Sequence, residues 1–292
     1  LVADSFSLGL VTAAGSLGLL FPPSLPLILY ALTAGISVKS VFIAGLLPGL
    51  IRVGIVSSWA VWQGRNHSIS NHKFNIRNAM HELNTAKWEI IIPFFILFGI
   101  FGGFTTLVET AALIVIYVVM VEVFIYKDLK LNDLVRISSE CGTLIGGVLI
   151  ILGVAMGLTS FLVDAQIPLQ LLEWVKSNIS SKFVFLIMLN IFLLAIGCMM
   201  DIFSAIIISV PLITPIGAYF GIDPLHLAII FIANLELGFL TPPVGMNLFL
   251  SAYRFDEDMS TIYKSTIPFF IAMLISVIAI TYLPILSIWA TN

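Results

Sequence analysis

The stretch "ANLELGFLTPPVGMNLFL", residues 233–250, places two adjacent prolines inside an apolar segment long enough to cross a bilayer. Proline lacks a backbone N–H and clashes with the carbonyl four residues earlier, so the pair Pro242 and Pro243 opens a helix at this point. Non-helical backbone at membrane depth is tolerated only where it is buried in protein or lines a cavity. The stretch therefore predicts a broken transmembrane helix beside a cavity.

The composition indicates a membrane protein. Of the 292 residues, 60% are hydrophobic and 10% are charged, and the mean hydropathy is +1.12. A soluble domain of this length carries about 25% charged residues. Apolar runs recur along the chain, and each suits a membrane span, because a bilayer core needs about 20 helical residues. We predict an all-α polytopic membrane protein whose surroundings are lipid and which binds no nucleic acid.

The apolar runs give a list of expected spans. They cover residues 5–33, 41–62, 90–104, 109–126, 142–163, 183–216, 225–253 and 267–289. The first and the seventh are interrupted by proline pairs, and residues 183–216 are too many for one span. The polar connectors 64–88, 127–140 and 254–265 are expected to form interfacial helices, in the first case from Ile76 onward.

The distribution of Lys and Arg predicts the orientation of the chain. Short cytoplasmic loops are enriched in these residues. If connector 64–88 is cytoplasmic, alternation places the other two connectors on the same side, and that side then holds nine Lys and Arg against three. This assignment requires residues 183–216 to enter and leave the membrane on the same side. The polar interruption "GCMMDIFSA" at 197–205 lies midway, so we predict a re-entrant hairpin there.

The opening segment repeats the pattern of the stretch quoted first. Residues 13–30 read "AAGSLGLLFPPSLPLILY", and an offset of 220 aligns Gly18 with Gly238 and the pair Pro22–Pro23 with Pro242–Pro243. The predicted orientation makes the two segments cross the membrane in opposite directions. Inverted repeats with discontinuous helices are typical of secondary transporters, in which substrate and coupling ions bind at the breaks.

The breaks suggest what they bind. Carbonyl groups freed by the prolines need partners, and a desolvated Na⁺ satisfies several oxygens at once. Ser24, Thr241 and Asn247 supply side-chain oxygens beside the breaks. The N-termini of the half-helices that follow carry partial positive charge, which suits an anionic group of a substrate.

Three of the charged residues within the apolar segments suggest specific roles. Intramembrane carboxylates are functional candidates, and Asp201 is expected to shape an ion or substrate site, directly or by holding the hairpin tip. Glu236 is expected to form a hydrogen bond between helices or to face a pore. Arg52 is expected to be paired or to extend toward the interface.

Enzyme motifs are absent from the sequence. It contains no H-E-x-x-H, no G-x-S-x-G and no G-x-x-x-x-G-K-[ST], so we expect neither an enzyme nor ATP hydrolysis. Transport would then use an ion gradient, without a cofactor. The alternatives are a stand-alone dicarboxylate/Na⁺ symporter with inverted repeats, a non-transporting membrane scaffold and an intramembrane enzyme.

The two proline motifs, "MDIFSAIIISVPLITPI" at 200–216 and "GGFTTLVETAAL" at 102–113 together resemble a known family. This family is the large membrane subunit of tripartite ATP-independent periplasmic (TRAP) transporters. The resemblance implies an elevator-type, Na⁺-driven importer of organic carboxylates such as C4-dicarboxylates or sialic acids in the bacterial inner membrane. It also implies two partners, a small four-helix membrane subunit and a periplasmic substrate-binding protein. The family's first hairpin is expected to precede residue 1, and the chain without it is not expected to transport.

The resemblance also implies a domain organisation. Residues 1–36 would form the first broken helix of a transport domain and residues 37–140 scaffold helices with interfacial arms. Residues 141–253 would form the second transport half, with a hairpin at 183–216 and a broken helix at 225–253. Residues 254–292 would form an interfacial arm and the last scaffold helix.

The family places Na⁺ at the hairpin and the breaks, and substrate between them. The ion-binding set expected here is Gly15, Ser16, Gly18, Pro22, Ser24, Asp201, Ser204, Gly238, Thr241, Pro242, Gly245 and Asn247. The expected substrate-binding residues are Ser16, Ser24, Ser204 and Thr241.

Overall fold

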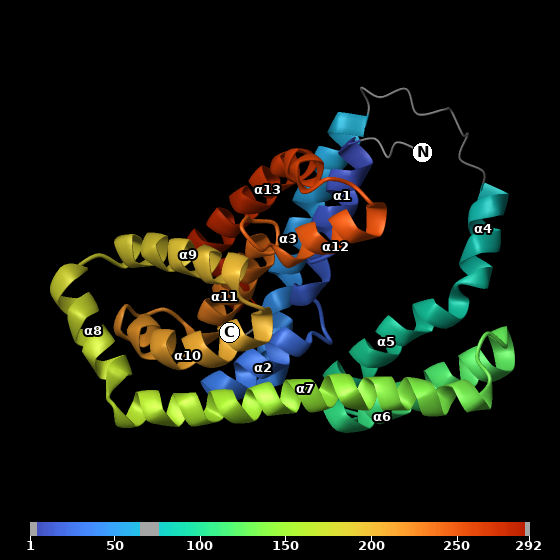
Figure 1. Ribbon diagram of the computed structural model, residues 1–292, viewed down its shortest axis with the longest axis horizontal. Helices are drawn as coiled ribbons and strands as arrows, with labels where there is room; N and C mark the ends of the chain where they lie inside the picture. Colours follow the sequence, from blue (N-terminus) through green and yellow to red (C-terminus); the bar gives the residue numbers. More distant parts are fainter. Residues whose placement is uncertain (1–4, 65–75, 290–292) are drawn as a thin grey trace. The chain divides into compact units, whose positions relative to one another are not determined.

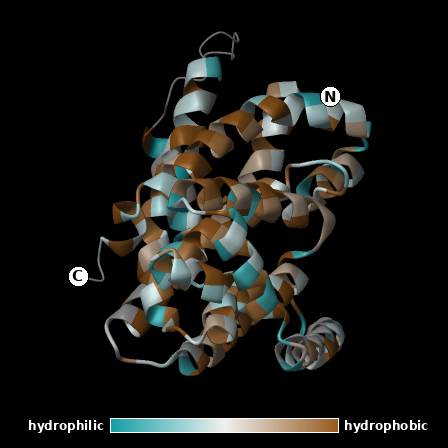
Figure 2. Cartoon of the chain, turned by 90° about the vertical axis from the view of Figure 1, so that its left-hand side faces the viewer, coloured by the Kyte–Doolittle hydropathy of each residue, from teal (hydrophilic) through white to brown (hydrophobic). Residues whose placement is uncertain are grey.

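The computed structural model describes residues 5–64 and 76–289, and every regular element in these ranges is helical (Figure 1). Five of these helices are long and apolar enough to cross a membrane, and a sixth span results if one bent pair is counted. Hydrophobic residues predominate along many of the helices (Figure 2). The predicted all-α polytopic membrane fold is confirmed.

The chain forms two compact units, residues 1–67 with 152–292 and residues 68–151. The first unit contains most of the helices. They are α1 (Ser5–Ala14), η1 (Leu17–Leu20), α2 (Leu25–Ala34), α3 (Val38–Gly64), the end of α7 (Leu131–Asp164), α8 (Ile167–Asn178), α9 (Lys182–Met199), α10 (Ile202–Tyr219), α11 (Pro224–Gly238), α12 (Met246–Phe255), α13 (Met259–Tyr282) and α14 (Ile285–Ile288).

The second unit contains α4 (Ile76–Thr85), α5 (Lys87–Phe101), α6 (Leu107–Met120), the π-helical turn η2 (Val121–Tyr126) and the larger part of α7. Helix α6 begins with a capping box, in which the Thr106 hydroxyl and the Glu109 carboxylate each bond the other's backbone N–H. Helix α4 confirms the helix predicted from Ile76. Residues 65–75, the earlier part of that connector, lie outside the described residues.

Two predicted interfacial helices are wrong as separate elements. Connector 127–140 supplies the first turns of α7, which continues without a break to Asp164. No proline occurs between residues 131 and 164, and extending an existing helix adds one hydrogen bond for each residue fixed. Connector 254–265 likewise forms no helix of its own. Helix α12 ends in it at Phe255, Asp256 follows in the left-handed conformation, and α13 begins at Met259.

The structure confirms both predicted helix breaks, which lie in the first unit. The first separates η1 from α2, and the bend there is 42°. The second separates α11 from α12. The Pro22–Pro23 and Pro242–Pro243 peptide bonds have the same cis geometry. The repeat continues into the helices that follow, because Pro48 of α3 and Pro268 of α13 are also 220 residues apart.

Residues 183–216 form two helices, α9 and α10, which are joined at Met200 and Asp201. The predicted interruption is therefore confirmed, and the two helices run in opposite directions in Figure 1. Helix α9 packs against α11, whereas α10 packs against α2. The hairpin thus bridges the two broken helices. Each of its helices is long enough to cross a membrane alone. That the hairpin enters and leaves the membrane on one side therefore stays a prediction.

The contact between α9 and α11 depends on two glycines that meet backbone to backbone. A Cβ atom added to Gly238 would lie 2.6 Å from the Gly197 Cα, and one added to Gly197 would lie 3.2 Å from the Gly238 Cα. Gly197 lies at the end of the hairpin's first helix, and Gly238 ends α11 directly before the break. This close approach therefore sets the distance between hairpin and break.

We predict that Gly238→Ala lowers the free energy of unfolding of the purified protein by about 1–3 kcal/mol, because the contacted atoms are backbone and cannot move aside. Gly54→Ala is the matched control. Gly54 also lies inside a helix, but a Cβ there meets nothing within 4 Å. Unfolding in detergent, followed by circular dichroism, measures the difference. Equal effects of the two substitutions would contradict the close approach.

Candidate functional site

The hairpin tip is built around Asp201, which caps the N-terminus of α10. Its carboxylate accepts hydrogen bonds from the Ser204 backbone N–H at 3.0 Å and from the Ser204 hydroxyl at 2.6 Å. Asp201 is half-buried. Asp201 therefore caps the hairpin tip, and one function of Ser204 is to orient its carboxylate, whereas the expected part of Asp201 in an ion or substrate site stays a prediction.

The second break is hydrogen-bonded to the end of the hairpin's first helix. The backbone N–H groups of Val244 and Gly245 lie 3.2 and 3.4 Å from the carbonyl oxygen of Cys198 and donate to it. Gly245 has a φ of +45°, a conformation that favours glycine. A Cβ there would lie 2.9 Å from the Thr241 carbonyl oxygen and 3.1 Å from that of Phe239. Two carbonyl oxygens therefore approach the same point.

The side chains of the second break also have defined partners. The Thr241 hydroxyl donates to the Leu237 carbonyl oxygen at 3.0 Å, which leaves its lone pairs available to a cation. The Asn247 amide donates to the Thr12 carbonyl oxygen at 3.2 Å and so connects α12 with α1. A Cβ on Gly15 would lie 3.4 Å from that amide nitrogen.

The first break contains two serines in different surroundings. The Ser24 hydroxyl accepts a hydrogen bond from the Leu27 N–H at 3.4 Å and caps α2. Ser16 is 1% exposed, and its hydroxyl has no hydrogen-bond partner among the described residues. A buried polar atom without a partner is costly, so the Ser16 hydroxyl suits a ligand, which can be a cation at its oxygen or an acceptor of its O–H.

A cavity of about 370 Å³ lies where the first break, the hairpin tip and the second break meet. Its lining residues are Gly18, Leu19, Pro23, Ser24, Leu25, Pro26, Asp201, Ile202, Phe203, Phe239 and Met246. The wall includes the first residues of α2, α10 and α12. Helix N-termini carry partial positive charge, whereas Asp201 adds a carboxylate. The cavity can therefore attract both an anion and a cation.

The predicted site residues divide into two groups. Gly18, Ser24 and Asp201 line the cavity. The others lie in the same three segments, although not in the cavity wall. They are Gly15, Ser16, Pro22, Ser204, Gly238, Thr241, Pro242, Gly245 and Asn247. The structure brings all three segments together, while the assignment of individual ligands stays a prediction.

The sequence analysis did not pair two charged residues that it singled out. Arg52 of α3 and Glu236 of α11 form a buried ion pair, and Arg52 also donates to the Ala233 carbonyl oxygen at 3.1 Å. The expected inter-helix bond of Glu236 and the expected pairing of Arg52 are confirmed. Opposite charges in two apolar segments were the available signal.

These features define a class, namely a multi-pass membrane protein in which an internal repeat of broken helices surrounds one cavity. Comparison with protein families identifies its family. The model described as "Tripartite ATP-independent periplasmic transporter, DctM component" matches residues 2–286. The chain belongs to this family.

Curated relatives support the assignment. The C4-dicarboxylate TRAP transporter large permease protein DctM of Pseudomonas aeruginosa is 33% identical over 291 residues, covering 99% of this chain and 68% of the relative. The isethionate TRAP transporter permease protein DctMQ of Oleidesulfovibrio alaskensis is 30% identical and is covered over 44% of its length, with 96% of this chain aligned. The sialic acid TRAP transporter large permease protein SiaM of Vibrio cholerae is 28% identical, covering 96% of this chain and 66% of the relative. The chain therefore spans about two thirds of the length of two of these relatives and less than half of the third.

The crowding at Gly245 can be tested against a second left-handed glycine. Gly35→Ala should cost about 1–2 kcal/mol of stability, because Gly35 has a φ of +67° but no atom near an added Cβ. Gly245→Ala should cost about 1–3 kcal/mol more, because its Cβ also displaces two carbonyl oxygens. Parallel unfolding measurements on both variants decide this. A loss at Gly245 no larger than at Gly35 would show that the oxygens do not converge there.

Proposed function

We propose that the chain forms most of the permease subunit of a Na⁺-coupled transporter that imports organic carboxylates. The substrates would be C4-dicarboxylates or sialic acid-like anions. A periplasmic binding protein would deliver them, and a small four-helix membrane subunit would complete the complex in the bacterial inner membrane. The observation that carries this proposal is the cavity onto which the N-termini of α2, α10 and α12 open.

The cavity's electrostatics favour an anion that enters together with a cation. The N-termini of α2 and α12 provide partial positive charge for a carboxylate group, whereas that of α10 is already capped by Asp201. Asp201 lies in the same wall, and its charge repels a second carboxylate unless a cation is present. Na⁺ bound beside Asp201 would remove this repulsion. Coupling between ion and substrate then follows from the charge arrangement itself.

The residues around the breaks suit Na⁺ as the transported ion. The second break offers the Thr241 hydroxyl and the carbonyl oxygens of Phe239 and Thr241 near Gly245. The first break offers the buried Ser16 hydroxyl, which has no partner in the described part of the chain. Hard cations prefer such oxygen ligands. In an elevator-type movement, the transport domain would carry ion and substrate together.

The substrate classes named for the relatives support a carboxylate or a related anion. The three relatives are named for a C4-dicarboxylate, a sulfonate and a sialic acid, all of which carry an acid group. The stand-alone symporter remains the second hypothesis within transport. Its distinguishing property is uptake without a binding protein.

The decisive assay uses the complete gene product, reconstituted in proteoliposomes with its small subunit and binding protein. We expect uptake of a labelled anion from a panel of dicarboxylates, sialic acid and isethionate, and we expect this uptake to need both an inward Na⁺ gradient and the binding protein. Replacing Na⁺ by K⁺ should abolish it. Uptake with Na⁺ alone would indicate a stand-alone symporter, whereas no uptake by a folded complex would contradict the proposal.

The charge of Asp201 can be separated from its capping function. Asn caps helices about as well as Asp, so Asp201→Asn should keep the hairpin tip but remove the carboxylate. We expect stability near that of the wild type and a half-saturating Na⁺ concentration raised by about tenfold or more, which corresponds to the loss of about 1.4 kcal/mol of binding free energy.

Asp223→Asn is the matched control for this substitution. Asp223 caps α11 through hydrogen bonds to the Leu225 and His226 N–H groups, and it does not line the cavity. Its replacement should leave the Na⁺ dependence of uptake unchanged. Unaltered Na⁺ dependence in Asp201→Asn as well would remove Asp201 from the ion site.

A further inference from the structure

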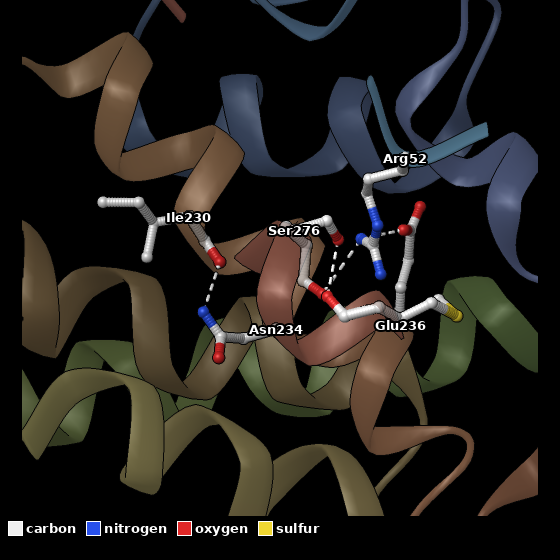
Figure 3. A network of polar contacts seen from close by, with 7 residues as sticks. Arg52, Ile230, Asn234, Glu236 and Ser276 are labelled. Atoms are coloured by element: carbon white, nitrogen blue, oxygen red, sulfur yellow. Dashed lines mark hydrogen bonds and ion pairs between the residues drawn. The ribbon is translucent and has the colours of Figure 1, made fainter. Parts of the chain in front are cut away.

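The ion pair of Arg52 and Glu236 lies at the centre of the first unit. Figure 3 shows Arg52 extending from α3 toward the Glu236 carboxylate, with a second bond to the backbone of α11. The two residues are 1% and 0% exposed. Both of these helices also pack against η1, which ends at Leu20 directly before the first break. The pair therefore joins α3 and α11, the two helices that pack against η1.

The face of α3 that carries Arg52 is shaped to hold the first break. A Cβ on Gly45 would lie 2.6 Å from the Leu20 carbonyl oxygen, and one on Gly49 would lie 3.0 Å from the Phe21 ring. Positions 45, 49 and 52 share one side of a helix. The two glycines therefore allow the first break to approach α3 closely. Arg52 lies on the same face of α3 and contacts α11.

The ion pair and the end of η1 lie close in the chain to residues of the cavity wall. Leu20 follows the cavity residue Leu19, and Glu236 precedes the cavity residue Phe239 by three positions. These two wall residues belong to the first and the second broken helix respectively. The pair thus holds together the two opposite halves of the repeat at the point where both contribute to the wall.

The geometry of the pair does not favour a large contribution to the stability of the fold. Arg52 Nε and Nη2 and Glu236 Oε1 are buried without a hydrogen-bond partner among the described residues. Buried ion pairs often contribute less to stability than apolar residues of similar volume, and charges within a membrane protein are costly. Its presence at this depth calls for a function other than stability.

The internal repeat shows that a break can form without such a pair. At the offset of 220, Glu236 corresponds to Ser16 and Arg52 corresponds to Ala272. The symmetry-related positions Ser16 and Ala272 carry no charge, yet the first half contains the same proline break. The ion pair, which joins α3 of one half to α11 of the other, is therefore not a requirement of the repeat.

We propose that Arg52 and Glu236 are a positioning pair that fixes the first break against α11 and so sets the spacing of the cavity walls. The pair touches neither ion nor substrate. It acts by keeping the ion-binding groups of the two broken helices at a fixed separation, which lowers the Na⁺ concentration needed for uptake. The part of this inference that concerns Na⁺ rests on the proposed function.

The test replaces both charges together, in the variant Arg52→Met/Glu236→Met of the complete permease. Because both charges leave at once, no unpaired buried charge remains and the variant should fold with at least wild-type thermal stability. We expect the half-saturating Na⁺ concentration to rise by about fivefold or more, a typical size for coupling between distant groups, while the maximal uptake rate changes less than twofold. The Na⁺-induced shift of the melting temperature, measured without substrate, should decrease in parallel.

Ser276→Ala is the matched control, because Ser276 is fully buried in the same region, and its hydroxyl donates to the Met273 carbonyl oxygen of its own helix (Figure 3). It should leave the Na⁺ dependence unchanged. A double-Met variant with wild-type Na⁺ dependence would overturn the proposal, and so would one that loses only maximal rate. If the wild type itself shows neither Na⁺-dependent uptake nor a Na⁺-induced melting shift, the proposed function fails instead.

The single variant Glu236→Gln, which leaves Arg52 unpaired, should lose stability as well as Na⁺ affinity.

Discussion

The dominant constraint on this fold is that no backbone polar group can remain unpaired inside a bilayer. Each proline pair interrupts a helix at membrane depth, and the chain must then satisfy the freed groups from elsewhere. At the second break, the hairpin does this, because the Cys198 carbonyl oxygen accepts the N–H groups of Val244 and Gly245. The break and the hairpin are consequently one structural unit. The glycine contact between α9 and α11 allows the close approach that these hydrogen bonds need.

The same constraint explains why the cavity lies where three interrupted segments meet. A helix that begins in the middle of a protein exposes N–H groups that have no partner within the helix. Ser24 and Asp201 cap two such helices with their side chains, whereas Gly245 provides no side-chain cap for α12. Uncompensated N–H groups at a cavity wall are a binding surface for an anion. The breaks that cost backbone hydrogen bonds thus create the site.

The sequence predicted the features that depend on local chemistry. Proline pairs determine the breaks, and the polar residues around Asp201 interrupt the long apolar run, so these were found without a structure. The interfacial helices at 127–140 and 254–265 were predicted wrongly, because polar composition does not show whether a helix continues into the next span. The pairing of Arg52 with Glu236 could not be deduced either. The two residues are 184 positions apart, and only the packing of α3 on α11 brings them together.

The difference between the two halves of the repeat has a physical consequence for transport. Two identical halves would hold the cavity from both sides with equal rigidity. The ion pair joins α3 of one half to α11 of the other, whereas Ser16 and Ala272, the symmetry-related positions, carry no charge. A charge pair in a low-dielectric interior resists separation strongly. The two symmetry-related arrangements therefore differ in rigidity, and the less constrained one contains Ser16, whose hydroxyl is buried and has no partner among the described residues.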